Sequence, residues 1–101
     1  MSATRPAKFP LGRIIVTPGV AELVFLHGLD PFPYLWRHES GDWGDLDADD
    51  RKVNEEALRK DFRLLSAFTT EVAYQSGAPV RLWIITDAER VSTTLLLPEE
   101  Y

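Results

Sequence analysis

The chain has 101 residues, of which 45% are hydrophobic and 27% are charged, and it contains no cysteine. This composition is typical of one folded domain, and the lack of cysteine excludes disulfides, thiolate metal sites and a thiol nucleophile. The absence of cysteine also suits a reducing cytoplasm, where we expect the protein to be. The net charge of −5 opposes general binding to nucleic acid or anionic membranes, so we expect a protein partner and no direct nucleic-acid contact.

The N-terminal region predicts an arm followed by a strand. Residues 1–8 are small, polar or interrupted by proline, so we expect a flexible arm there and a single domain over residues 9–101. No stretch approaches the roughly 18 apolar residues that a membrane-spanning helix needs, and no membrane segment is expected. Residues 12–16, GRIIV, are rich in β-branched side chains and precede a proline, which favours a short strand.

Two short helices are predicted after this strand. The first follows Thr17, a good N-cap, and ends at Gly28, which suits the left-handed conformation of a C-cap. The second starts at the N-cap and proline pair of residues 30–31 and ends before Gly41, because glycine makes a further helical turn costly by roughly 1 kcal/mol. Its aromatic and aliphatic side chains are expected to face the core: Phe32, Leu35 and Trp36.

A third helix is predicted by its charges. Asp47 is its expected N-cap with Asp50 three residues later, and Glu56 and Lys60 have the i,i+4 spacing that favours an ion pair. Only a narrow stripe of this helix is apolar: Val53, Ala57 and Leu58.

The C-terminal third alternates with the period of two that is typical of strands. Residues 62–73, 80–86 and 91–97 predict a three-stranded antiparallel meander, to which the N-terminal strand can add. The middle strand is apolar on both faces, so we expect one face, including Trp83, to be free for a partner protein or for a homodimer; otherwise the chain is a monomer. The predicted fold class is therefore α+β: a short N-terminal strand, three short helices and the meander.

The segment from Trp36 to Asp50 combines aromatic, imidazole and hydroxyl groups with six acidic side chains. We hypothesise that it is the main contact surface for a protein partner, through His38, Ser40, Asp42, Trp43 and Asp45. In the alternative interpretation, Trp43 folds back into the core with its N–H bonded to a carboxylate or carbonyl, and the acids are a solvated face.

Two other functions, and one structural interpretation of His38, remain open at this stage. A small ribonuclease-like enzyme would use a base, a hydroxyl and cations to cleave RNA; the candidates are His38, Arg63 and Thr86, with Arg81, Arg90 and Tyr101. In the simpler interpretation, His38 is a surface residue that caps the second helix. The acidic segment also suggests an inhibitor that presents carboxylates to the basic channel of a host nuclease or defence complex.

No cofactor and no metal are expected. The residues Asp45, Asp47, Asp49 and Glu56 have the spacing of a calcium loop, but the position that requires glycine is Asp50. No phosphate-binding or dinucleotide-binding motif is present.

The stretches FPLGRI, HESGDWGDL, LLSAFT, LWIIT and STTLLLPEEY resemble a family of short, uncharacterised proteins carried by bacterial plasmids and integrative conjugative elements. The resemblance covers nearly the whole chain and implies a role connected with a mobile element. Members of the family are sometimes labelled type I restriction enzyme modification subunit. This chain is too short for a methyltransferase cofactor domain and has no catalytic Asn-Pro-Pro-aromatic motif. We therefore predict a non-enzymatic accessory protein that acts through protein contacts.

Overall fold

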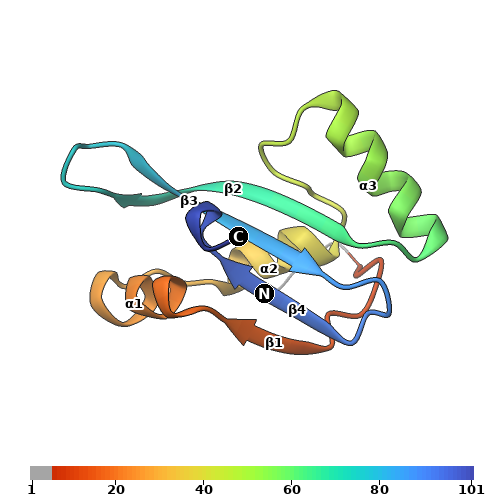
Figure 1. Ribbon diagram of the computed structural model, residues 1–101, viewed down its shortest axis with the longest axis horizontal. Helices are drawn as coiled ribbons and strands as arrows, with labels where there is room; N and C mark the ends of the chain where they lie inside the picture. The colour runs from red at the N-terminus through yellow and green to blue at the C-terminus, as the bar shows by residue number, and fades with distance from the viewer. Residues whose placement is uncertain (1–5) are drawn as a thin grey trace.

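A four-stranded mixed sheet and three α-helices form the structure, a computed structural model that describes residues 6–101 (Figure 1). The elements in chain order are β1 (Arg13–Val16), α1 (Pro18–His27), α2 (Phe32–Glu39), α3 (Ala48–Lys60), β2 (Leu64–Ala73), β3 (Pro79–Thr86), β4 (Ser92–Leu96) and the 3₁₀ turn η1 (Pro98–Glu100). The predicted α+β class is confirmed. Residues 1–5 of the predicted arm lie outside the described residues.

The sheet has the strand order β1-β4-β3-β2. Strands β2, β3 and β4 form the predicted antiparallel meander, whereas β1 pairs with β4 in parallel. The sheet is therefore mixed rather than purely antiparallel. The N–H of Thr17 donates to the carbonyl of Leu95 at 3.1 Å, which ties the end of β1 to β4 just before α1 begins.

The predicted helix ends are confirmed for α1 and α3. Thr17 caps α1, and Gly28 ends it with a φ of 70°, a conformation that glycine adopts at little cost. Asp47 caps α3 by accepting a hydrogen bond of 2.9 Å from the N–H of Asp50. These signals act within one turn of chain, so they can be read from the sequence.

Helices α1 and α2 cover one side of the sheet, which we call the inner face. The main core lies between these helices and the sheet. Its buried members are Val20, Leu23, Leu29, Leu35, Phe68, Val80, Leu82, Ile84, Leu95 and Leu97. The expected orientation of α2 was wrong in part. Leu35 and His38 face the sheet, whereas Phe32 and Trp36 are 57% and 50% exposed because, four residues apart, they share the opposite side of the helix.

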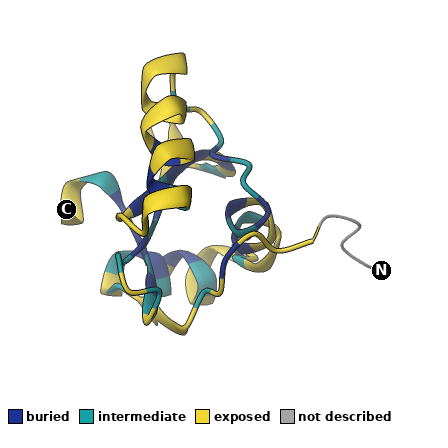
Figure 2. Ribbon diagram, turned by 90° about the vertical axis from the view of Figure 1, so that its right-hand side faces the viewer, coloured by how far each residue is buried: buried dark blue, intermediate teal, exposed yellow. Residues whose placement is uncertain are grey.

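Helix α3 does not lie over the sheet but beside its β2 edge, and most of it is exposed (Figure 2). Ala57 is buried as expected, but Val53 is 64% exposed. Asn54 is buried instead, and its side-chain amide bonds to both the N–H and the carbonyl of Leu65 in β2. The polar residue Asn54 therefore contributes to the contact between α3 and β2, where the sequence predicted apolar side chains only.

Candidate functional site

The side chain of His38 is completely buried between α2 and the inner face. Its Nδ1 lies 2.6 Å from Oγ of Ser66, and its Nε2 lies 2.9 Å from Oγ1 of Thr86. Thr86 continues the chain of hydrogen bonds to Thr93 at 2.7 Å, and Thr93 donates to the carbonyl of Leu11 at 2.7 Å. The network joins α2 to β2, β3, β4 and the segment before β1.

The carbonyl at the end of this network fixes the direction of its hydrogen bonds. Since the carbonyl of Leu11 can only accept, Thr93 donates to it and accepts from Thr86. Thr86 then accepts from His38, so Nε2 carries the proton and Nδ1 accepts from Ser66. When the imidazole of His38 is neutral, every hydrogen bond of this network has one donor and one acceptor.

Burial, together with the nearby charge of Arg90, lowers the pKa of His38 from its ordinary value of 6.5 to about 3. Arg90 is itself held by the carbonyls of Phe62 and Ala57, at 2.7 and 3.0 Å. His38 and Thr86, two of the catalytic candidates, are therefore close together but fully buried. The assignment of this pair to a substrate site is corrected, because no substrate can reach it in this fold.

The predicted contact surface around Trp43 is also corrected. Trp43 is only 4% exposed, its Nε1 donates to the carboxylate of Glu55 at 2.7 Å, and its ring stacks at 6.3 Å on Phe9. This is the alternative in which the indole folds into the core. Ser40 is buried as well, and its hydroxyl donates to the carbonyl of Arg37.

The acids of the same segment make contacts within the protein. Asp42 accepts a charged hydrogen bond of 2.7 Å from Nε of Arg37, and Asp45 accepts one of 2.7 Å from the hydroxyl of Thr69. The segment lies along β2, where Ala67 bonds to the backbone of Trp43 and Asp45. Asp42 therefore holds the loop to α2 and Asp45 holds it to β2, while Asp49 and Asp50 are exposed at the start of α3. The acidic-inhibitor hypothesis stays a prediction.

The other side of the sheet, which we call the open face, carries Arg13, Ile15, Leu65, Arg81, Trp83, Ile85 and Thr94, with Arg63 just before β2. In the strand register, Ile15 lies beside Thr94, Thr94 beside Ile85 and Ile85 beside Leu65. This row of Ile15, Thr94, Ile85 and Leu65 crosses all four strands, and its side chains are at least partly exposed. Ala67 and Leu96, which flank Trp83 on the same face, are buried. Residues 98–101 are on this side of the sheet and the helices α1 and α2 on the other (Figure 2).

Tyr101 contacts both Trp83 and Arg63 on the open face. The rings of Trp83 and Tyr101 meet in a T-shaped arrangement with centroids 5.6 Å apart. Nη1 of Arg63 donates to the hydroxyl of Tyr101 at 2.6 Å, and the guanidinium lies 5.5 Å from the centre of the same ring. The side chain of Tyr101 is nevertheless 66% exposed.

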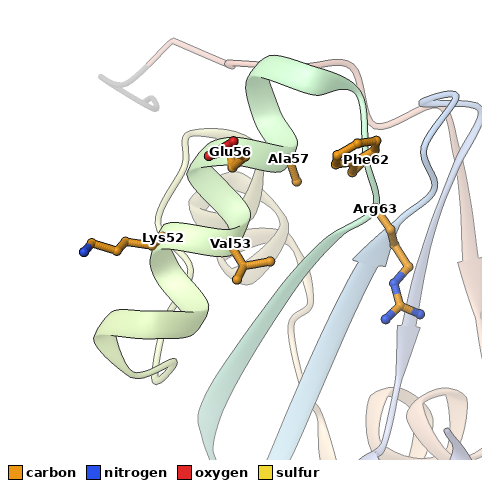
Figure 3. Close-up of a pocket in the computed structure, with 6 residues that line it drawn as sticks. All are labelled: Lys52, Val53, Glu56, Ala57, Phe62 and Arg63. Carbon is orange, nitrogen blue, oxygen red and sulfur yellow. The ribbon is translucent and has the colours of Figure 1, made fainter.

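A cavity of about 400 Å³ opens beside this cluster, between α3 and the start of β2 (Figure 3). Val53 and Phe62 are its large apolar side chains, and they are 64% and 57% exposed. In Figure 3 Arg63 extends from the start of β2, while Lys52 points away on the far side of α3. The apolar area of the open face therefore continues beyond Leu65 onto the helix.

The open face is also rich in cations. Arg13, Arg63 and Arg81 are exposed, and the carboxylate of Asp45 lies 3.8 Å from the guanidinium of Arg81. Of the predicted binding residues, Trp83 lies at the centre of this surface and Asp45 at its rim. Of the ribonuclease candidates, Arg63, Arg81 and Tyr101 come together here. The apolar middle strand was the sequence signal for this face, but nothing in the sequence placed Tyr101 on Trp83.

Within residues 6–101, no group of three or more His, Cys, Asp or Glu side chains is arranged to hold a metal ion. No helix among them is long and apolar enough to cross a membrane. No protein-family model, curated protein or solved structure matches the chain.

Proposed function

We propose that this protein is a non-enzymatic accessory protein of a mobile element and that it binds a partner protein through its open face. The mobile-element context rests on the sequence resemblance. The observation that carries the binding role is the cluster of Trp83, Tyr101 and Arg63 on the sheet face opposite α1 and α2.

The chemistry of this cluster supports a protein partner. Tryptophan, tyrosine and arginine are the residues most often found at the energetic centres of protein interfaces, where truncation costs 2 kcal/mol or more. Here Tyr101 already contacts both Trp83 and Arg63, so little conformational entropy remains to be lost when a partner covers them. The apolar row from Ile15 to Leu65 supplies the surrounding surface that excludes water.

The charges favour a particular kind of partner surface. Three exposed arginines, at positions 13, 63 and 81, surround the apolar centre, and the chain as a whole is acidic. A partner with an apolar patch and carboxylates at its rim would be attracted to this face and repelled by the rest of the molecule.

Co-purification from the host cell tests this proposal. The tagged protein is compared with Trp83→Ala, Arg63→Ala and the matched variant Trp36→Ala, which removes a 50% exposed tryptophan from the opposite side of the molecule. We expect one stoichiometric partner with the original chain and Trp36→Ala, and an affinity lower by at least about thirtyfold for Trp83→Ala. If Trp36→Ala loses the partner and Trp83→Ala retains it, the helical side is the interface and the proposal fails.

A ribonuclease is the second candidate, because Arg63, Arg81 and Tyr101 share the open face and Arg63 is bonded to the tyrosine hydroxyl. The guanidinium groups would hold the phosphates of the RNA. The phenol of Tyr101 would serve as the acid–base group, because His38 is buried. Incubation of structured and single-stranded RNA with the original chain and with Tyr101→Phe tests it. Cleavage that disappears in Tyr101→Phe would favour this candidate over the binding role, and no cleavage removes it.

A further inference from the structure

The two edges of the sheet differ in whether their outward backbone groups are hydrogen-bonded. On the β2 edge, the backbone groups that point away from the sheet are bonded. Leu65 bonds to the side chain of Asn54, and Ala67 donates to the carbonyl of Trp43 and accepts from the N–H of Asp45. This edge is closed to any further strand over these residues.

The β1 edge is open. β1 is the last strand of the sheet, and its N–H groups at Arg13 and Thr17 donate to carbonyls of the β4 side at 2.8 and 3.1 Å. Because backbone groups alternate in direction along a strand, those of Ile14 and Val16 point away from β4. Among residues 6–101, no strand or loop pairs with them.

Apart from Arg13 at its start, the side chains of β1 are apolar on both faces. Ile14, Ile15 and Val16 are 42%, 40% and 42% exposed. Edge strands of monomeric proteins are usually blunted by lysine, proline or a bulge, since an unprotected edge recruits another strand. β1 has only four residues and begins with the charged Arg13, but the stretch from Ile14 to Val16 carries no charge, proline or bulge that would oppose a neighbouring strand.

We propose that β1 pairs with β1 of a second copy of this chain, in antiparallel orientation, to give a symmetric dimer with one continuous eight-stranded sheet. The twofold axis passes beside Ile15, so Ile15 faces Ile15 of the second copy and Ile14 faces Val16. The outward N–H and carbonyl groups of Ile14 and Val16 then bond reciprocally across the axis.

This register is the one in which the sequence complements itself. It joins both outward-pointing residues of each copy, and it places β-branched side chains opposite one another, a favourable cross-strand pairing. Arg13 faces Thr17 of the second copy, so no like charges are opposed. An axis at Val16 would place Ile14 opposite Pro18, which has no N–H to donate. The edge thus fits a copy of itself in a defined alignment.

The dimer does not depend on the partner protein proposed above, because β1 contributes only Arg13 and Ile15 to the open face. It would, however, join the open faces of two copies side by side. A partner with two equivalent sites would then bind with a higher effective concentration than a single copy provides.

Sedimentation equilibrium of the full chain between 5 and 500 µM, concentrations on the order of typical Kd values for small dimers, tests the proposal directly. We expect a dimer for the original chain and an association constant lower by at least about tenfold for Ile14→Pro. Proline at this position removes only an outward N–H, which edge strands tolerate, so circular dichroism and the melting temperature should be preserved. Ile15→Lys leaves the backbone intact and would place two like charges opposite one another across the axis. If Ile14→Pro fails to fold, a lower association constant for Ile15→Lys tests the proposal instead.

Single-cysteine cross-linking tests the register, and it is free of background because the chain has no cysteine. Residues facing one another across a non-hydrogen-bonded antiparallel pair have Cα atoms about 4.5 Å apart, within disulfide range. Ile15→Cys should therefore form a disulfide dimer at least about tenfold faster than Phe25→Cys, an 83% exposed position on α1. A monomer at 500 µM, a dimer unaffected by both edge variants, or equal cross-linking at the two positions would overturn the proposal.

Discussion

Arg63 donates a hydrogen bond of 2.6 Å from Nη1 to the hydroxyl of Tyr101, across 38 residues of sequence. Tyr101 in turn lies against Trp83. The cluster thus joins the start of β2, the middle of β3 and the segment after β4. Because the three side chains restrain one another, we infer that the open face is preformed before a partner arrives.

Glu100 is predicted to keep Tyr101 in this position. Its carboxylate accepts hydrogen bonds from the hydroxyl of Thr17 at 2.6 Å and the N–H of Gly19 at 2.9 Å, which ties residues 98–101 to the start of α1. In Glu100→Ala we expect this segment to detach and the nuclear Overhauser contacts between Trp83 and Tyr101 to disappear. Glu89→Ala, an exposed control, should retain them, and retention in both variants would contradict the role of Glu100.

His38 is predicted to make the fold sensitive to acid. Its pKa is about 3 in the folded chain against 6.5 ordinarily, so the unfolded chain takes up the proton first as the pH falls. The stability that depends on neutral His38 is complete above pH 6.5 and is lost between pH 6.5 and 3, by about 1.4 kcal/mol per pH unit.

Urea unfolding at pH 7, 5 and 4 checks this, with His38→Gln as the comparison. Glutamine can donate and accept hydrogen bonds but does not titrate, so His38→Gln should be less stable at pH 7 and should lose less stability on acidification. The exposed His27→Gln should behave like the original chain. Parallel pH profiles for all three proteins would contradict the assignment.

Gly44 is predicted to be irreplaceable for steric reasons. Its φ is 76°, and a Cβ there would lie 2.1 Å from the carbonyl oxygen of Ala67. Gly77 has a φ of 92° with open space around it, so Gly77→Ala measures the backbone cost alone, roughly 1–2 kcal/mol. We expect Gly44→Ala to lose roughly 1–3 kcal/mol more in urea unfolding. Equal losses would show that the loop can move away from β2.

Asn54 is predicted to act as a substitute for a neighbouring strand. Asn54→Ala leaves the N–H and carbonyl of Leu65 without their partner, which should lower the free energy of unfolding by roughly 1–3 kcal/mol. Hydrogen exchange at the Leu65 amide should accelerate. Glu56→Ala removes only exposed ion pairs with Arg59 and Lys60 and should change stability by less than about 0.5 kcal/mol.

Local features of the fold were predictable, because their causes lie within a few residues. The caps at Thr17, Gly28 and Asp47 and the alternation of the three C-terminal strands are of this kind. The orientation of α2 was not, because Leu35 and Trp36 are both apolar and only packing against the sheet decides which one is buried. The parallel pairing of β1 with β4 likewise depends on contacts about 80 residues apart.

The candidate site was misplaced for the same reason. His38 was expected among surface groups, but its hydrogen-bond partners Ser66 and Thr86 lie 28 and 48 residues away and leave no local signal. The hypothesis placed the contact surface at the acids and Trp43, whereas the fold buries the indole of Trp43 and uses the backbone of Trp43 and Asp45 to close the β2 edge. Trp83 was recognisable because the middle strand has more apolar residues than one buried face requires.

The central claim is that the open face around Trp83 is the surface that a partner contacts. Site-specific photo-cross-linking in the host cell tests it most directly, with a benzophenone amino acid placed at position 83, at position 36 or at position 25. We expect a single cross-linked protein from position 83 and none from the other two. The same adduct from position 36 or 25, with none from position 83, would contradict it.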